Sequence, residues 1–199
     1  MQDAKPYEIL AIDIETTGAL ITENEIVSIG YVFGDKDGNI TEKGRVDFKV
    51  NKPFEERCYT EFWSKNMKIY DDLQANALEP KIAIRNFAEI LDRHEAKNDV
   101  RVISDFAAFD PCWIGYYFSF FLKRLPLYYT HDIKFRPIYD IDSYTRGVMH
   151  MNYENPWIND SVVIEKYKLS LSQITPHYPE EDAQHIYEFH VQLIKALRK

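Results

Sequence analysis

The stretch AIDIETTG, residues 11–18, decides how the rest of the chain is interpreted. It lies in a run of apolar residues typical of a buried β-strand, yet it carries Asp13 and Glu15. Side chains alternate along a strand, so both acids project from one face while the flanking isoleucines project from the other. Neighbouring carboxylates raise each other's pKa and are costly to bury. The pair therefore either faces solvent or is neutralised by a cation.

The size and charge of the chain restrict the class of protein. Its 199 residues fit a single domain, 1–199, and the net charge of −8 argues against a broad basic surface for duplex nucleic acid. Bound metal ions could still reverse the local field around some of the acids. Cys58 and Cys112 have no paired spacing and no secretory leader precedes them, so we expect reduced thiols in the cytoplasm. No stretch reaches the roughly 20 apolar residues of a membrane span, so we expect no membrane partner.

Hydrophobic periodicity predicts a strand meander followed by alternating helices and strands. The expected strands cover residues 7–14, 25–33, 45–50, 101–106 and 135–142. The expected helices cover the residues from about 80, those from 111 to about 123, and those from about 179 onward. Residues 146–160 are polar and weakly periodic, which favours a loop or short insertion. The order of elements indicates an α/β fold with a mixed central sheet flanked by helices.

Two further motifs supply candidate polar residues. SDFAAFD ends with Asp110 at a strand-to-helix junction, a common position for functional side chains in α/β folds. An aspartate before Pro111 is equally a good helix N-cap. In HYPEEDAQH, Asp182 falls in the first turn of the last helix, pointing toward the body of the domain. His177 precedes it by five positions, and taken singly either residue could be a surface group or, for the acid, a helix-dipole partner.

Together these residues indicate a metal-dependent hydrolase. Four carboxylates, Asp13, Glu15, Asp110 and Asp182, are oxygen donors of the kind that Mg²⁺ and Mn²⁺ prefer. His177 adds a group whose type titrates near neutral pH. Two divalent cations held by such a set can activate water and stabilise the leaving oxygen in an attack on phosphorus.

On these motifs the sequence resembles the DEDDh family of 3′-to-5′ exonucleases, which includes ribonuclease T, oligoribonuclease and bacterial polymerase proofreading subunits. AIDIETTG, SDFAAFD and HYPEEDA occur in the family's order and cover nearly the whole chain. The middle motif departs from the pattern, because Asp105 and Phe106 stand where the family often has a His-Asn pair. Asp110 is kept, but the departure leaves the substrate contacts near this motif open.

The resemblance implies a ribonuclease H-like fold and hydrolysis of phosphodiester bonds at single-stranded DNA or RNA 3′ ends, releasing nucleoside 5′-monophosphates. It implies that Asp13, Glu15, Asp110 and Asp182 hold two Mg²⁺ or Mn²⁺ ions and that His177 is the general base. Because ribonuclease T-like members often form dimers, a homodimer is also open. The alternatives are a catalytically weak nuclease-fold binding module and an endonuclease or strand-transfer enzyme of the same broad fold. Retention of all five polar residues argues against the binding module.

The resemblance also implies where substrate binds. Thr16, Thr17 and Gly18 would hold the terminal sugar. The candidates for contact with bases are Leu20, Phe62, Trp63, and Phe106 or Phe109. Trp63 is favoured because TEFWSKN resembles a segment near the active site of ribonuclease T-like and phage exonucleases. Five basic residues could contact phosphates, although a solvated surface charge is the favoured interpretation of each: Lys123, Arg124, Lys134, Arg136 and Arg146. Asp140 and Asp142 form a competing acidic pair on a predicted strand, which we interpret as structural or supporting.

Overall fold

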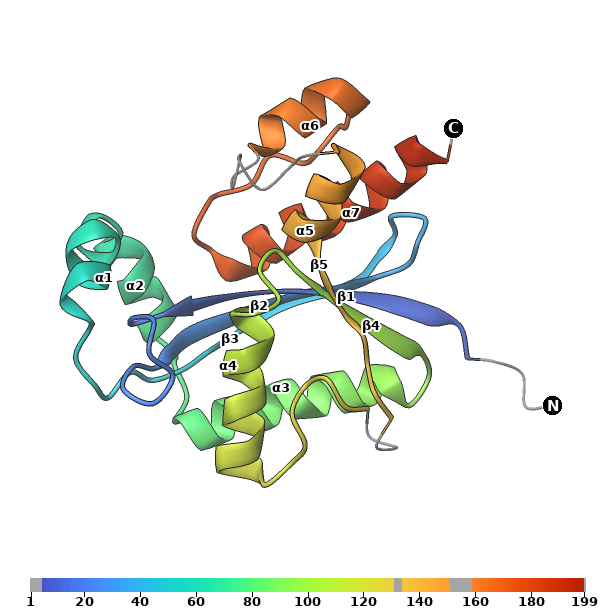
Figure 1. Cartoon of the computed structure of the whole chain (residues 1–199). Coiled ribbons are helices and arrows are strands. Elements are labelled where there is room, and N and C mark those ends of the chain that lie inside the picture. Colours follow the sequence, from blue (N-terminus) through green and yellow to red (C-terminus); the bar gives the residue numbers. More distant parts are fainter. Residues whose placement is uncertain (1–4, 131–133, 151–158, 199) are drawn as a thin grey trace.

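The computed structural model describes residues 5–130, 134–150 and 159–198. Its centre is a five-stranded sheet of order β3-β2-β1-β4-β5 (Figure 1). The strands are β1 (Tyr7–Thr16), β2 (Ile26–Gly34), β3 (Ile40–Asp47), β4 (Asp99–Ser104) and β5 (Ile138–Asp140). The first three strands form an antiparallel meander, whereas β4 and β5 run parallel to β1. The mixed α/β sheet predicted from the sequence is confirmed.

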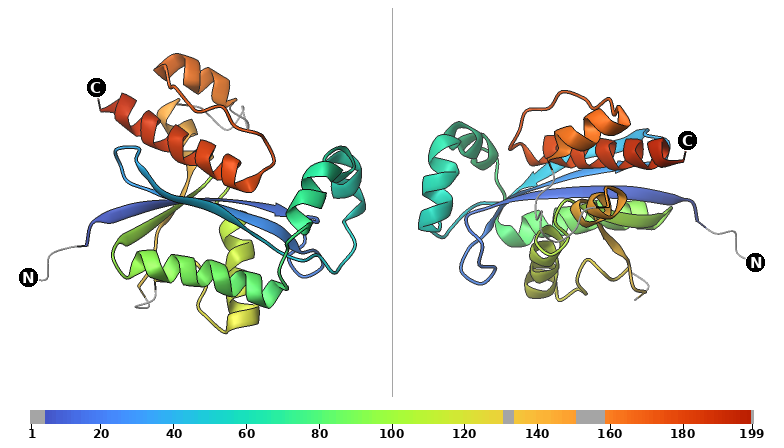
Figure 2. Two further views of the ribbon diagram at one scale, coloured as in Figure 1. Left: turned by 180° about the vertical axis from the view of Figure 1, so that it is seen from behind. Right: turned by 45° about the horizontal axis from the view of Figure 1, so that its top comes forward.

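Helices cover both faces of this sheet (Figure 2). They are α1 (Glu56–Glu61), η1 (Trp63–Lys65), α2 (Met67–Gln74), α3 (Pro80–Glu95), α4 (Asp110–Tyr117), η2 (Phe118–Leu122), α5 (Ile141–Val148), α6 (Asp160–Tyr167) and α7 (Pro179–Leu197). The α3 and α4 helices lie on one face, and α7 with α5 and α6 lies on the other. The α1 and α2 helices stand beside the end of the sheet at which β1 finishes.

The alternation of side chains along β1 divides the core into two layers. Ile12 and Ile14 pack with the residues of α3 and α4 in one apolar cluster. Ile9 and Ala11 pack with α7 in another. Since the period of a strand is two, Asp13 continues the row formed by Ile9 and Ala11, and its side chain projects toward the α7 layer.

The third and fifth strands differ from their predicted bounds. The third strand begins at Ile40 and ends at Asp47, earlier than the predicted 45–50, because the hairpin turn at Asp35–Gly38 is tight and Gly38 takes a φ of 90°. The fifth strand has only three residues, since the Asp140 side chain accepts a hydrogen bond from the Ser143 N–H and caps α5.

The predicted loop at 146–160 is wrong at both ends. The α5 helix continues to Val148, and α6 begins at Asp160 after an Asn159 cap whose side chain accepts from the Ser161 N–H. Residues 151–158 of this segment lie outside the described residues. Across the described part of the chain, no helix has the length and apolar content needed to cross a membrane.

Candidate active site

The two acids of the opening stretch lie near the carboxyl end of β1. Asp13 pairs in register with Gly30 of β2, and Glu15 pairs with Ser28. Both acids are partly exposed, whereas Ile12 and the other inward side chains of this strand are buried. Both acids therefore lie at the partly exposed end of β1, on the face of the sheet that α7 covers.

Asp110 reaches the same region from α4, of which it is the first residue. Its side chain is buried, and one carboxylate oxygen accepts a short hydrogen bond from the Ser104 hydroxyl at the end of β4. Ser104 is paired in register with Ile12, which brings the end of β4 beside the acids of β1. The N-cap residue of α4 is Phe109, so the alternative that Asp110 caps the helix is wrong.

The start of α7 is held against the sheet at a glycine. A Cβ atom at Gly30 would lie 1.9 Å from the carbonyl carbon of Pro179, so a residue with a side chain cannot occupy this position without moving the helix. Gly30 is the register partner of Asp13. This close approach brings Asp182, in the first turn of α7, to the acids of β1.

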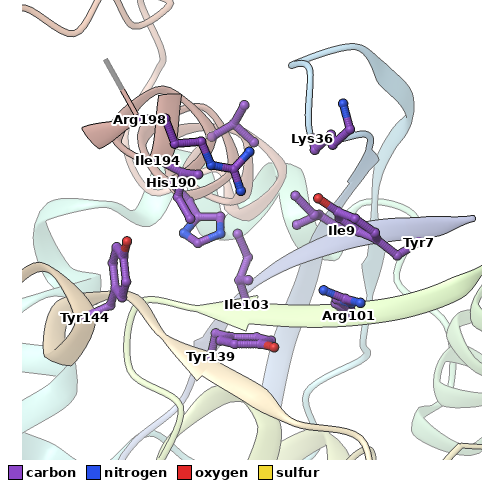
Figure 3. Close-up of a pocket in the computed structure, with 11 residues that line it drawn as sticks. Tyr7, Ile9, Lys36, Arg101, Ile103, Tyr139, Tyr144, His190, Ile194 and Arg198 are labelled. Carbon is purple, nitrogen blue, oxygen red and sulfur yellow. The ribbon is translucent and has the colours of Figure 1, made fainter. Parts of the chain in front are cut away.

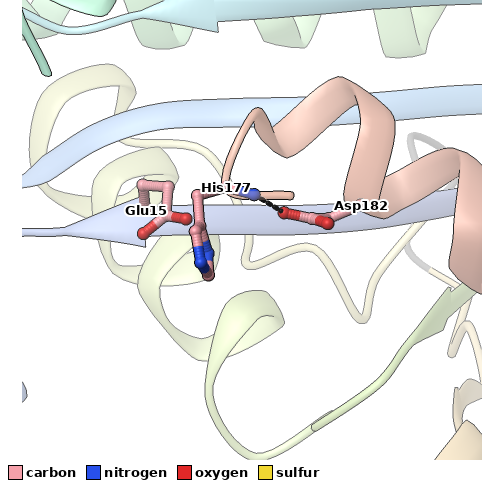
Figure 4. Close-up of side chains that lie close together, drawn as sticks. All are labelled: Glu15, His177 and Asp182. Carbon is pink, nitrogen blue, oxygen red and sulfur yellow. Dashed lines mark hydrogen bonds between the residues drawn. The ribbon is translucent and has the colours of Figure 1, made fainter. Parts of the chain in front are cut away.

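His177 enters the site from the segment before α7. Its backbone has a left-handed φ of 70°, and its N–H donates to Asp182 Oδ2 at 2.8 Å (Figure 4). Its ring packs edge-on against Phe62, with 4.9 Å between the ring centroids. One ligand atom from each of Glu15, His177 and Asp182 lies within 4.8 Å of the other two. The structure thus brings together residues from distant parts of the sequence, since His177 follows Glu15 by 162 positions and precedes Asp182 by 5.

The charges of the carboxylates link Asp13 and Asp110 to this trio. Burial, and then the charges of Asp110, Glu15 and Asp182, raise the pKa of Asp13 well above its usual value. Burial followed by the charges of Asp182 and Asp110 raises the pKa of Glu15 to about 8. Burial raises the pKa of Asp110 to about 6, although its hydrogen bond from Ser104 acts in the opposite direction.

Asp182 is affected in the same direction. Burial raises its pKa, while the backbone N–H and the imidazole of His177 partly offset the shift. Four carboxyl groups that disfavour one another's ionisation need a counter-charge. Carboxylate oxygens with one imidazole suit a hard divalent cation such as Mg²⁺ or Mn²⁺, so the residues present fit a metal centre.

Comparisons with known proteins bear on the fold of the chain. Neither the protein-family models nor the curated proteins gave a match. Pop2p of S. pombe in its Mg²⁺- and Mn²⁺-bound form has a TM-score of 0.66 at 16% identity, over 94% of this chain and 82% of that chain. The nuclease domain of 3′hExo, a DEDDh family member bound to rAMP, has 0.66 at 15% identity, over 94% and 92%. Exonuclease X in complex with 5′ overhanging duplex DNA has 0.58 at 14%, over 96% and 93%.

The chain shares the ribonuclease H-like fold of these structures. The fold expected from the motifs is therefore confirmed, and at these identities the likeness establishes the fold alone. The four carboxylates of this chain come from β1, the start of α4 and the start of α7. The roles of these residues are argued below from their own geometry.

The turn that follows β1 in this fold is held by internal hydrogen bonds. The Thr16 hydroxyl donates to the Gly18 carbonyl oxygen at 2.9 Å, and the fully buried Thr17 hydroxyl accepts from the Glu25 N–H at 2.9 Å. Both hydroxyls thus support the shape of the turn, and the contact with a sugar expected of them stays a prediction. Leu20 follows the turn with 55% of its side chain exposed, in keeping with the substrate contact predicted for it.

Trp63 has a different role from the one predicted. Its ring is fully buried, and its Nε1–H donates to the Thr16 carbonyl oxygen at 2.8 Å. A buried ring presents no face to a base, so we assign Trp63 to holding the end of β1. Phe109 is partly buried against Trp113, with ring centroids 6.0 Å apart, whereas its neighbour Phe106 is 60% exposed. Exposure favours Phe106 over Phe109 for contact with a base.

The competing acidic pair has structural partners. Asp140 accepts hydrogen bonds from the backbone N–H groups of Ala107 and Ser143, and Asp142 pairs with Arg146 Nε at 2.8 Å. Asp142 lies in α5, so the two acids do not share a strand face as predicted. Arg136 is neither the solvated charge that was favoured nor open to a phosphate, because this side chain is buried and pairs with Glu95.

Two residues beside the site, His185 and Asp160, were not singled out by sequence reasoning, and Asp105 was noted only as a departure from the second motif. His185 Nε2 lies 3.2 Å from Asp160 Oδ2, and this hydrogen bond raises the pKa of His185. Burial of its carboxyl group and then the charges of Asp160 and Asp142 raise the pKa of Asp105 to about 6. The only signal in the sequence was the departure of the second motif at Asp105, since His185 and Asp160 meet through the packing of α6 on α7.

Proposed function

We propose that this chain is a metal-dependent 3′-to-5′ exonuclease that acts on single-stranded nucleic acid and releases nucleoside 5′-monophosphates. The observation that carries the proposal is the convergence of Asp13, Glu15, Asp110 and Asp182 with His177 at the end of β1. The fold shared with exonucleases supports it. Burial and neighbouring charges disfavour the ionised form of each acid and raise its pKa, and such shifts are typical of functional sites.

The four carboxylates would hold two divalent cations, and the charges of the other three all act on Asp13. When bound, Mg²⁺ or Mn²⁺ would supply positive charge to the phosphate under attack. His177 is placed to accept a proton from the attacking water, and its edge-on contact with Phe62 fixes the plane of its ring. The water oxygen bonds to phosphorus, the bond to the 3′ oxygen breaks, and that oxygen takes up a proton.

The substrate would enter past exposed apolar side chains. Leu20 and Phe106 are 55% and 60% exposed, and such side chains give affinity for bases without demanding a sequence. The 3′hExo domain is bound to rAMP and exonuclease X to DNA, so this fold is compatible with either sugar. We leave the choice between DNA and RNA to experiment, and the homodimer and cytoplasmic location stay predictions, the latter supported by free thiols at Cys58 and Cys112.

The test uses 5′-labelled single-stranded RNA and DNA of one sequence, incubated with Mg²⁺, Mn²⁺ or EDTA. We expect a ladder that shortens from the 3′ end and that disappears with EDTA and in Asp13→Ala. Asp142→Ala is the matched control, because it removes an acid that pairs with Arg146 and should leave the ladder intact.

The rival functions give different products in the same experiment. A binding module would shift the labelled strands in a gel without shortening them in any metal. An endonuclease would cut a circular single strand, which an exonuclease leaves whole. Either result, or cleavage that persists in EDTA, contradicts the proposal.

A further inference from the structure

A cavity of about 220 Å³ lies between the sheet and the C-terminal half of α7 (Figure 3). Its walls come from the first residues of β1, from β4, β5 and α5, and from the turn after β2. Tyr7 lines it, and Asp13 lies six residues further along the same strand. Ile9 also lines it and lies four residues before Asp13, roughly 13 Å at about 3.3 Å per residue, and none of the carboxylates lines it. The cavity is therefore distinct from the carboxylate site.

The inside of the cavity is apolar and its sides are aromatic. Ile9, Ile103 and Val191 are all buried and form its floor. Tyr139 and Tyr144 also line it and remain 41% and 38% exposed, so both rings are accessible from the surface. Flat rings against an apolar floor suit a planar group, because stacking and burial both favour it.

The rim of the cavity is cationic. Lys36, Arg101 and Arg198 line it, and none of its described lining residues is acidic. The Arg101 guanidinium lies 4.2 Å from the centre of the Tyr7 ring, which holds it in place. Lys36 also pairs with Asp37 at 2.8 Å, but both side chains are more than half exposed and such pairs are weak. In a chain of net charge −8, three cations around one opening favour an anion.

Arg198 is the cation most available to a ligand. It follows the last residue of α7, and its guanidinium turns toward the cavity (Figure 3). Among the described residues it has neither an ion-pair nor a hydrogen-bond partner. A cation suits the end of a helix in any case, but a guanidinium directed into a cavity offers two parallel donors to a phosphate.

His190 adds a directional polar group inside the cavity. Its Nδ1 atom is buried and has no hydrogen-bond partner among the residues that the structure describes. Burial lowers the pKa of His190 to about 4, so its ring is neutral near pH 7 and can either donate or accept. A buried polar atom without a partner is costly, and a ligand that supplies one is stabilised by it.

We propose that this cavity binds a nucleoside monophosphate, with the base between the tyrosines and the phosphate at the rim by Arg198 and Arg101. The volume is below the 300 Å³ or so of a typical small-molecule pocket, so the cavity takes the planar base and the phosphate stays at the open rim. The inference rests on the shape and charge of this cavity and does not require the chain to be a nuclease.

The test measures binding of AMP, adenosine and inorganic phosphate by calorimetry in EDTA, which removes divalent cations from the carboxylate site. We expect AMP to bind more tightly than either part alone, by roughly tenfold or more for each part removed. Arg198→Gln should weaken AMP by about tenfold, since it removes a charge-assisted hydrogen bond. Tyr139→Ala should weaken AMP and leave phosphate unchanged.

Two further variants make the result decisive. Lys81→Gln removes one exposed charge from α3, on the opposite face of the sheet, and should leave AMP binding unchanged. His177→Asn alters the carboxylate site and should also leave it unchanged. Absence of AMP binding, phosphate binding as tight as AMP, or loss of AMP binding in His177→Asn with retention in Arg198→Gln would each overturn the proposal. Thermal unfolding of every variant confirms that it is folded, and none of these outcomes depends on cleavage.

Discussion

Asp13 lies beside three other carboxylates, and burial together with their charges raises its pKa well above the usual value. An ionised carboxylate in this position destabilises the metal-free chain. The same negative charge is what attracts a divalent cation. The charge of Asp13 therefore favours binding of a cation and disfavours folding of the metal-free chain. A bound cation offsets the repulsion, which is why two acids can occupy an otherwise apolar strand.

Asp13→Asn separates these two effects, since it keeps the shape of the side chain and removes its charge. We expect nuclease activity to fall by roughly a thousandfold, because several kcal/mol of charge stabilisation is lost with the cation. We expect Tm in EDTA at neutral pH to rise by roughly 2–4 °C, the shift that about 1 kcal/mol produces in a chain of this size. Calorimetric unfolding and the 3′-end ladder measure the two effects.

Asp142→Asn is the matched control for that variant. It makes the same chemical change at an acid whose partner is Arg146, at 2.8 Å, so the Tm should fall slightly and activity should be kept. A fall in Tm for Asp13→Asn as well would contradict the repulsion that we infer at the end of β1.

His177 has a left-handed backbone, so its role as a base is tested best by asparagine, which tolerates that conformation. His177→Asn keeps the backbone N–H that donates to Asp182 and removes the imidazole. We expect kcat to fall by about 10²- to 10⁴-fold, with the Tm increase caused by Mg²⁺ retained. Loss of the Mg²⁺ effect on Tm would show that His177 acts in binding the cation and not as a base.

At the scale of elements, the predictions succeeded where the hydrophobic pattern was strong. The helices α3 and α7 were predicted because their apolar side chains recur at helical spacing. The strand β1 was predicted from its run of apolar residues. The short β5 strand was overpredicted, because the pattern does not show that Asp140 ends it by capping α5. The four carboxylates and His177 all came from motifs, and the structure brings Glu15, His177 and Asp182 together.

Features that depend on contacts between distant elements could not be predicted. The burial of Trp63 and its hydrogen bond to Thr16 need the position of η1 relative to β1. The placement of α7 likewise depends on Gly30, whose missing side chain leaves room for the backbone of Pro179. Glycine inside a strand signals a close approach, but the sequence does not say which element approaches.

Gly30→Ala tests whether this contact positions the site. Its Cβ would meet the backbone of Pro179 at 1.9 Å, so the start of α7 must move, and Asp182 must move with it. We expect a loss of roughly 1–3 kcal/mol in the free energy of unfolding together with reduced kcat. Denaturant unfolding and the 3′-end assay check both quantities.

Gly147→Ala is the control for this substitution. No atom lies within 4 Å of a Cβ placed at Gly147 in α5, so alanine should be neutral or stabilise the helix by about 0.5–1 kcal/mol. Unchanged activity in Gly30→Ala would show that α7 can shift without disturbing the site.

At the scale of the whole molecule, both proposed sites lie between β1 and α7. The residues of β1 that face α7 run from Tyr7 and Ile9 at the cavity to Asp13 and Glu15 at the carboxylates. The α7 helix spans the same length, with Asp182 in its first turn and His190 toward its end. The apolar residues between the two sites thus separate the carboxylates at one end from the cationic side chains at the other. A bound anion is therefore held away from the acids.

The carboxylate site should make the stability of the whole chain depend on pH in a way that Mg²⁺ reverses. The folded-state pKa of Glu15 is raised from 4.5 to about 8, and that of Asp110 from 3.8 to about 6. Within these windows the native state binds more protons than the unfolded state, so the stability contributed by these groups falls as pH rises. Mg²⁺ replaces the protons, and should therefore raise Tm more at the upper end of the window than at the lower end. Calorimetry in EDTA and in Mg²⁺ measures the difference, which Glu15→Gln should reduce; a Mg²⁺ effect of equal size at both ends would contradict it.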